Sequence, residues 1–196
     1  MENVKNYWKK GISYEQYLKD CSEKIESLGK SDTPHDKTFL HYYELGLTRM
    51  QRVGKTYKPD PKQVSAFKTQ NFNGKFLVIS EGWCGDAAMI LPVIHQFFSE
   101  NELKIVYRDE NEELIQKYLT NGGKAIPIVL ILDQNENVLN HWGPRPKYGM
   151  ELLASHKENP EIYTAEDFHN DLQIYYTKNK GFDIIEELLL KISIRK

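Results

Sequence analysis

The sequence predicts an α/β fold, in which a mixed central β-sheet is flanked by helices and preceded by an all-helical N-terminal extension. Helical periodicity fills residues 1–70, whereas short apolar runs alternate with helical stretches in residues 71–196, the pattern of a sheet covered by helices. The charge balance changes at the same place, from +4 in the first part to −6 in the second. We therefore expect residues 1–70 to pack as an extension on a core domain formed by residues 71–196.

The extension is predicted to hold two amphipathic helices and a short third one. Residues 13–29 have capping-box spacing at Ser13, one apolar face and a terminal glycine. A second helix is expected over residues 33–54, with Pro34 in its first turn, and a third over residues 59–67. An apolar face on the first two helices indicates that they pack against something rather than form a linker.

The second part is predicted from alternating periodicity, turn residues and helix caps. Its expected elements are a buried strand at 75–80, a helix at 86–98, a strand at 103–107, a helix at 111–119, a hairpin of strands at 128–132 and 138–142, a short helix after Pro146, a helix opened by a capping box at Thr164, and a last helix at 182–194.

Composition excludes several classes of protein. Hydrophobic residues make up 40% of the 196 residues, charged residues 28%, and the net charge is −2, which excludes a disordered chain and a strongly basic nucleic-acid binder. The first ten residues are polar and no apolar run approaches the roughly 20 residues of a membrane span. We therefore expect a cytoplasmic protein with no nucleic-acid or membrane partner.

The two cysteines, Cys21 and Cys84, can neither build a disulfide scaffold nor fill a tetrahedral zinc site. The histidines show no metal-ligand spacing, so no metal and no cofactor are expected. Cys21 falls on the apolar stripe of the first long helix, which favours a buried small side chain; its alternative use is as a distant resolving thiol.

Cys84 belongs to the sequence Trp83-Cys84-Gly85-Asp86, which lies where the buried strand passes into a helix. Unpaired N–H groups and the dipole at a helix N-terminus stabilise a thiolate, and would lower a thiol pKa by about one unit. Asp86 suits the first helical turn, but its charge opposes the thiolate by a comparable amount. The sequence therefore leaves the acidity of Cys84 open.

This segment resembles the thioredoxin family. The resemblance rests on residues 79–87, on Pro92 eight residues beyond the cysteine, and on Ile126-Pro127 directly before the next strand, and it covers about residues 71–196. Among its members, the chain is similar to bacterial thioredoxin-like proteins with a WCGD motif and an N-terminal helical extension. The resemblance implies a thioredoxin-like fold.

The resemblance also implies a site. Ile126-Pro127 would be a cis-proline loop that faces Cys84 and, with Trp83, binds the substrate backbone. The substrate-binding residues expected on this basis are Trp83, Gly85, Asp86, Ala87, Ile126, Pro127 and Arg145.

Two departures from the family pattern concern the chemistry. Ala87 stands where a dithiol thioredoxin has its second cysteine, and Val78 aligns with the buried carboxylate that accepts a proton from that thiol. A dithiol enzyme releases its mixed disulfide through that second thiol. We therefore expect monothiol exchange, in which Cys84 attacks a protein disulfide or S-thiolated protein and an external low-molecular-weight thiol resolves the adduct.

Arg145 follows the last predicted strand, a region that lies beside the reactive cysteine in thioredoxin-like folds. There it would offset Asp86, stabilise a thiolate or bind an anionic substrate group. The alternative is an ordinary surface arginine in a turn.

Two other functions stay open. One is a non-catalytic module that binds a protein partner through the same groove. The other is binding of an iron–sulfur cluster or a small thiol, as in monothiol glutaredoxins, although those proteins carry CGFS where this chain has Cys84-Gly85-Asp86-Ala87.

Overall fold

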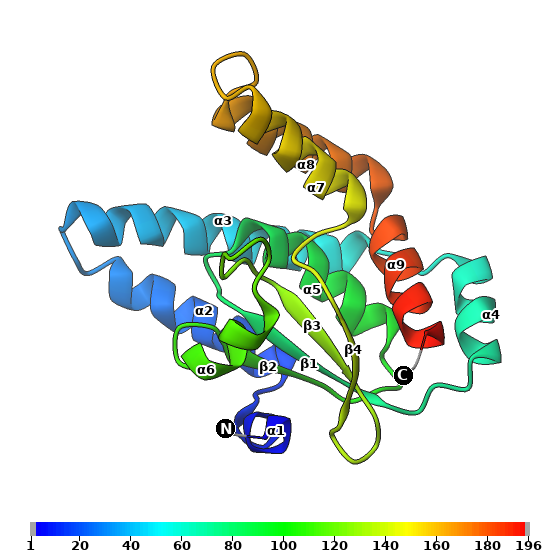
Figure 1. Cartoon of the computed structure of the whole chain (residues 1–196). Coiled ribbons are helices and arrows are strands. Elements are labelled where there is room, and N and C mark those ends of the chain that lie inside the picture. The colour runs from blue at the N-terminus through cyan, green and yellow to red at the C-terminus, as the bar shows by residue number, and fades with distance from the viewer. Residues whose placement is uncertain (1–2, 195–196) are drawn as a thin grey trace.

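The computed structural model describes residues 3–194 (Figure 1). The helices are α1 (Val4–Lys10), α2 (Tyr14–Leu28), α3 (Pro34–Thr56), α4 (Pro61–Thr69), α5 (Gly85–Phe97), α6 (Glu112–Ile115), α7 (Lys147–Glu158), α8 (Ala165–Asn179) and α9 (Phe182–Ser193), with a 3₁₀ turn at Gln116–Tyr118. The strands are β1 (Lys75–Ser80), β2 (Leu103–Tyr107), β3 (Ile128–Leu132) and β4 (Val138–Trp142).

The strands form one mixed sheet in the order β2-β1-β3-β4. β1 pairs in parallel with β2 and antiparallel with β3, and β3 pairs antiparallel with β4. Every residue of β3, and all of β1 after Lys75, is buried, as expected for central strands with near-continuous apolar sequence. The predicted fold class, a mixed sheet flanked by helices with helices before it, is confirmed.

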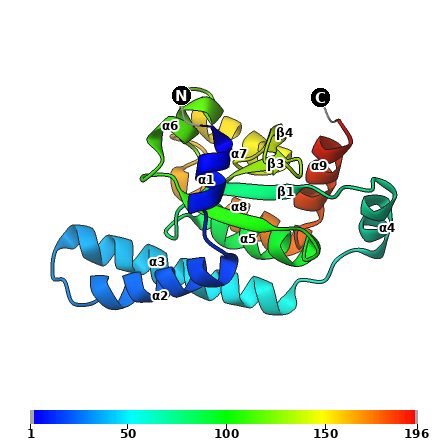
Figure 2. The ribbon, with the colours of Figure 1, turned by 90° about the horizontal axis from the view of Figure 1, so that it is seen from below.

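Helix α3 covers the sheet through α5, whereas α1 and α2 also contact β2 directly. Figure 2 shows α5 lying between the sheet and α3, with α2 alongside α3. The loop between β1 and α5 touches these helices directly: a Cβ at Gly82 would lie 2.7 Å from Cys21 Sγ on α2 and 2.5 Å from Tyr43 Cε1 on α3. Only glycine permits so close an approach, so the cysteine-bearing loop is packed against α2 and α3.

Side-chain caps begin several helices as the sequence predicts. The Oγ atoms of Ser13 and Thr164 accept hydrogen bonds from the backbone N–H groups of Gln16 and Asp167, both at 3.1 Å. The box at Thr164 is reciprocal, because Asp167 accepts from the Thr164 N–H. The one at Ser13 is not, because the Gln16 amide donates to an Asp20 carboxylate oxygen instead.

The largest differences from the sequence-based expectation concern four segments. The polar start of the chain forms α1, which buries Tyr7 and Trp8. α3 continues through Gly54 to Thr56, since the Gly54 carbonyl accepts a hydrogen bond from Gln96 on α5. Residues 111–119 are split between α6 and a 3₁₀ turn, and the helix after Pro146 is α7, a full 12 residues.

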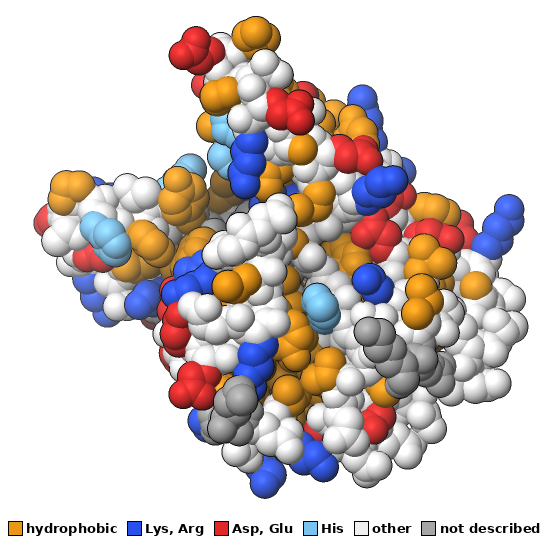
Figure 3. Space-filling model, viewed as in Figure 1, with side chains coloured by type: hydrophobic (Ala, Val, Ile, Leu, Met, Phe, Trp, Pro, Cys, Tyr) orange, Lys and Arg blue, Asp and Glu red, His pale blue; other side chains and the backbone are white. Residues whose placement is uncertain are grey.

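Helices α7 and α8 form a hairpin that stands away from the sheet (Figure 1). The hairpin also projects in the space-filling view, where acidic and basic side chains are interspersed over the visible face (Figure 3). α9 returns from the hairpin to pack on α5 and β4. None of the helices within residues 3–194 is long and apolar enough to cross a bilayer.

Candidate active site around Cys84

Cys84 is the N-cap residue of α5, at the end of a tight turn that follows β1. Its backbone N–H donates to the Glu81 carbonyl at 3.1 Å, and its own carbonyl accepts from the Ala88 N–H. The thiol points toward the segment before β3 and donates to the Ile126 carbonyl, with 3.4 Å between Sγ and oxygen. The Cys84 side chain is only 7% exposed. The structure therefore places the thiol at a helix N-terminus, as predicted, but beneath the surface.

Burial dominates the acidity of this thiol. It raises the pKa of Cys84 to about 12, and the nearby Asp86 carboxylate acts in the same direction. The backbone N–H groups of Ala87 and Asp86 and the Arg145 guanidinium lower it, but by less. The open question of acidity is thus answered for this conformation, since desolvation outweighs the helix terminus and Cys84 is a protonated thiol at neutral pH.

Asp86 is the centre of a buried polar cluster. Arg145 donates to Asp86 Oδ2 from both Nε (3.0 Å) and Nη2 (2.6 Å). The hydroxyl of Tyr176, on α8, donates to the other oxygen at 2.7 Å. These three charge-assisted bonds connect the N-terminal turn of α5 to the segment that enters α7 and to the last turns of α8.

Of the roles that the sequence left open for Arg145, the contacts correspond to offsetting the charge of Asp86. Its guanidinium lies beside Cys84 and faces Asp86, and two of its five N–H groups donate to Asp86 Oδ2. It neutralises that carboxylate more than it offers a free cation to a substrate. Its guanidinium carbon also lies 5.7 Å from the centre of the Phe168 ring.

The other predicted residues surround the thiol unequally. The Ile126–Pro127 peptide bond is cis, and so is Gly143–Pro144, which precedes Arg145. Ala87 is buried in the first turn of α5, one residue after Asp86.

Trp83 does not join the thiol cluster. It turns toward the N-terminal helices, where its ring meets Phe39 edge to face at 6.1 Å, and Arg108 lies 4.9 Å above it. The predicted substrate-facing surface is thus divided between two sides of the cysteine loop.

Three residues around this loop were not predicted. Tyr176 lies 90 positions from its partner Asp86. Arg49 of α3 reaches α5, because a Cβ at Gly85 would lie 3.7 Å from its Nη1 atom. Glu81 is a buried carboxyl three residues before Cys84. Of the three, only Glu81 has a signal in the sequence: it is an acidic residue directly after an apolar strand.

Among residues 3–194, no three His, Cys, Asp or Glu side chains come together in a group that would hold a metal ion. The site consists of one thiol, one compensated carboxylate and backbone groups. A cysteine that begins a helix and faces an X-Pro segment is the arrangement that the resemblance to thioredoxins implies.

Comparisons with known proteins identify the family. A family profile described as Thioredoxin matches residues 33–159. Thioredoxin from Bacillus subtilis (strain 168) is 38% identical over 77 residues, which is 37% of this chain and 71% of that protein. The chain belongs to the thioredoxin family.

Two solved structures resemble the whole chain. A protein of unknown function from Pseudomonas aeruginosa has a TM-score of 0.58 at 18% identity, and the match covers 98% of this chain and 98% of that one. An HIV epitope-scaffold has a TM-score of 0.62 at 16% identity, covering 97% of this chain and 98% of its own. At these identities the likeness concerns the fold alone. Since it spans nearly all residues, the helices before β1 and after β4 are part of a shared architecture.

Proposed function

We propose that this protein carries out monothiol thiol–disulfide exchange through Cys84. The observation that supports this function is the position of Cys84 at the N-cap of α5, with its Sγ 3.4 Å from the Ile126 carbonyl beside Pro127. Ala87 occupies the place of a second thiol, so the reaction uses an external one. The substrates are disulfide-bonded or S-thiolated proteins, and the proposed location is the cytoplasm.

The exchange has two balanced steps. Cys84 loses its proton to solvent, and its thiolate attacks a substrate disulfide; one S–S bond breaks, a mixed disulfide with Cys84 forms, and the leaving sulfur takes up a proton. A low-molecular-weight thiol then attacks the mixed disulfide. Its sulfur forms a new disulfide with the substrate sulfur and the Cys84 thiol is returned, so these two steps exchange disulfide partners without net reduction. Release of the substrate thiol takes a second small thiol, and the two electrons then come from the two small thiols, which leave as their own disulfide.

The burial of Cys84 sets a condition on this function. A thiol with a pKa of about 12 is almost entirely protonated at neutral pH, and only the thiolate attacks. Exchange therefore proceeds from a conformation in which Cys84 is more exposed than here. The same observation favours a second candidate, a non-catalytic module that binds a protein partner without using the thiol.

Intact-mass analysis after incubation with hydroxyethyl disulfide separates these candidates. Under the exchange proposal, we expect one adduct, placed on Cys84 by peptide mapping and removed by an added small thiol. Cys84→Ser abolishes it. Cys21→Ser is the matched control and keeps it, because Cys21 is just as buried but lies away from the helix terminus.

No adduct on Cys84 after exposure for many hours, with Cys84→Ser still binding its protein partner, would overturn exchange and leave the binding module. An adduct that forms on Cys21 instead would also contradict the proposal.

A further inference from the structure

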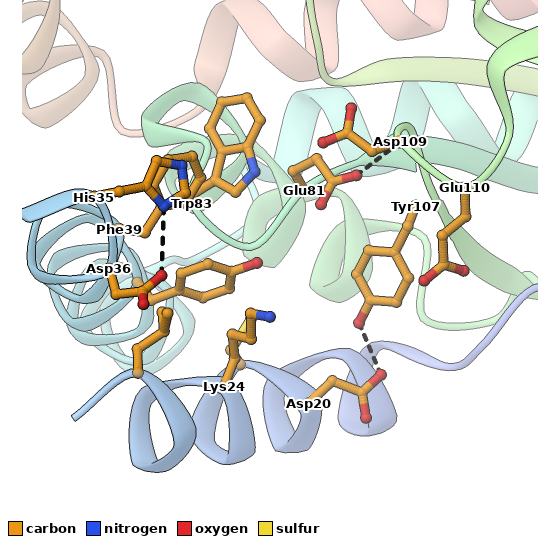
Figure 4. Close-up of a pocket in the computed structure, with 13 residues that line it drawn as sticks. Asp20, Lys24, His35, Asp36, Phe39, Glu81, Trp83, Tyr107, Asp109 and Glu110 are labelled. Carbon is orange, nitrogen blue, oxygen red and sulfur yellow. Dashed lines mark hydrogen bonds and ion pairs between the residues drawn. The ribbon is translucent and has the colours of Figure 1, made fainter. Parts of the chain in front are cut away.

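A cavity lies on the side of the cysteine loop that faces the N-terminal helices α2 and α3. It has a volume of about 420 Å³ and opens between α2, α3 and the loops that follow β1 and β2 (Figure 4). Its lining residues are Asp20, Cys21, Lys24, Leu28, His35, Asp36, Phe39, Tyr43, Glu81, Trp83, Tyr107, Asp109 and Glu110. We call it the acidic pocket. Trp83 borders it and immediately precedes Cys84, so whatever enters it lies next to the thiol loop.

Aromatic rings form much of its wall. Phe39 and Tyr43 come from α3, Trp83 from the cysteine loop and Tyr107 from the end of β2. Aromatic faces beside carboxylates are the surroundings that bind ammonium and guanidinium groups, because the ring quadrupole attracts a cation while the carboxylate pairs with it. Figure 4 shows the labelled rings of Phe39, Trp83 and Tyr107 together with Glu81 and Lys24 at this pocket.

The carboxyl of Glu81 is the group on which the inference depends. The residue is 6% exposed, and its Oε1 atom accepts a hydrogen bond from the Asp109 backbone N–H at 2.9 Å. Its Oε2 atom accepts none from the described residues, and it is not among the fully enclosed unsatisfied atoms, so it opens on the pocket. An oxygen that opens on the pocket and receives no hydrogen bond from the described residues is available to a ligand.

The protein's own charges compensate this carboxylate only in part: Arg108 lowers its pKa, but no described cation forms an ion pair with it. Asp109 is paired with Arg108 at 2.7 Å, which engages that cation elsewhere. Asp20 receives hydrogen bonds only from the neutral donors Gln16 and Tyr107. Lys24 is an exposed side chain that forms no ion pair with a described acid. The pocket is therefore strongly negative around a buried, half-satisfied carboxyl group.

We infer that the acidic pocket binds an organic cation, an alkylammonium or guanidinium group, whose charge pairs with Glu81 Oε2 between the rings of Tyr43 and Tyr107. Such a group can belong to a lysine or arginine side chain of a bound protein or to a free amine. The inference is independent of the reactivity of Cys84, because the pocket lies on the opposite side of the loop from Ile126 and Arg145.

The charges that face Glu81 fit this assignment. Burial raises the pKa of Glu81 to about 7, the Asp109 N–H and Arg108 lower it, and Asp109 and Glu110 raise it further. From the helices packed opposite, Asp20 and Lys24 of α2 and His35 and Asp36 of α3 also line the pocket. A bound cation would add a further interaction that favours the ionised carboxylate.

The test is a titration followed by the indole N–H resonance of Trp83 and the backbone resonance of Cys21. Butylammonium and butylguanidinium are the probes; pentanoate and butanol are their anionic and neutral counterparts. We expect both cations to shift these resonances at millimolar concentration, and the counterparts to leave them unchanged. Glu81→Gln should weaken binding about tenfold, the loss expected for one charge-assisted contact.

Further variants make the result specific. Glu110→Gln, an exposed rim residue whose replacement leaves the fold intact, should weaken binding about threefold, the effect of one exposed charge. Lys24→Met should strengthen it by removing a competing cation. Glu26→Gln, an exposed acid on α2 outside the pocket, is the matched control and should change nothing.

One peptide synthesised with lysine or with norleucine at a single position distinguishes the two sources of the cation. A lysine peptide that binds more tightly than butylammonium identifies a protein side chain, and equal affinities identify a free amine. Cys84→Ser should bind as the wild type does, which separates this test from that of thiol exchange. Shifts absent with every cation, or affinities unchanged in both Glu81→Gln and Glu110→Gln, would overturn the inference.

Discussion

Glu81 and Asp86 are two buried carboxyl groups within three residues of the same cysteine, yet their surroundings differ. Asp86 is 8% exposed and receives two bonds from Arg145 and one from Tyr176. Glu81 is 6% exposed and receives one bond, from a backbone N–H. Asp86 is therefore a closed structural cluster, whereas Glu81 is open to a pocket and its pKa rises to about 7.

The difference shows two ways in which a fold tolerates a buried acid. A cation and a hydroxyl compensate the first carboxylate, which ties separate segments together. The second has no cation in contact, so its protonation depends on pH and on what enters the pocket. The carboxylate on the hairpin side of the loop is thus paired within the protein. The carboxyl group on the N-terminal side is open to a ligand in the pocket.

Removing the cation from the closed cluster should have the largest effect. We expect Arg145→Met to lower the free energy of unfolding by about 3–5 kcal/mol, because it leaves the Asp86 carboxylate buried with only Tyr176 as a partner. Urea denaturation followed by circular dichroism measures the change.

Lys147→Met, two residues further on and exposed at the start of α7, is its control and should change stability little. If both variants lose the same amount, Asp86 does not need its cation and the contrast between the two carboxyls is wrong.

Neutralising the open carboxyl should change stability in a pH-dependent way. Glu81 has a folded-state pKa of about 7 against 4.5 as its ordinary value, so the folded state holds its proton more tightly. That contribution to stability is complete below pH 4.5 and is lost as pH rises through 7, a difference of about 3 kcal/mol at most. Glu81→Gln removes it, so the variant should gain stability relative to the wild type as pH rises.

Unfolding curves measured across this pH range test the expectation. Glu113→Gln, an exposed acid on the neighbouring α6, should follow the wild type at every pH. Parallel curves for the wild type and Glu81→Gln would mean that Glu81 is compensated after all.

Much of this fold follows from local sequence. β1 and β3 were predicted because an apolar, β-branched run suits a strand buried on both faces, and the helix at Thr164 because its cap is local. α1 was missed because its buried residues are two aromatics, Tyr7 and Trp8, whose burial depends on the strand beside them. The boundary between extension and core at residue 70 stays a prediction, and the family match itself begins at residue 33.

The candidate site divides in the same way. Cys84, Asp86 and Arg145 were chosen from short motifs, and the structure brings these three together. Tyr176 was missed because no local pattern relates it to a residue 90 positions earlier. Glu81 was missed because its burial depends on where α2 and α3 pack, and periodicity predicts that a helix packs without saying against what.

The smallest effect we predict concerns the thiol between the two carboxyls. Asp86→Asn removes the charge that, after burial, most raises the pKa of Cys84, and leaves the Arg145 guanidinium free to favour the thiolate. We expect alkylation of Cys84 by iodoacetamide to become about tenfold faster at neutral pH, the change that one pKa unit produces in thiolate population. Peptide-level mass spectrometry follows Cys84 separately from Cys21.

Glu100→Gln, an exposed acid beyond the other end of α5, should leave the rate unchanged. An unchanged rate in Asp86→Asn would show that burial alone holds the thiol protonated, and exposure, not charge, would then be the step that any substrate of Cys84 must bring about.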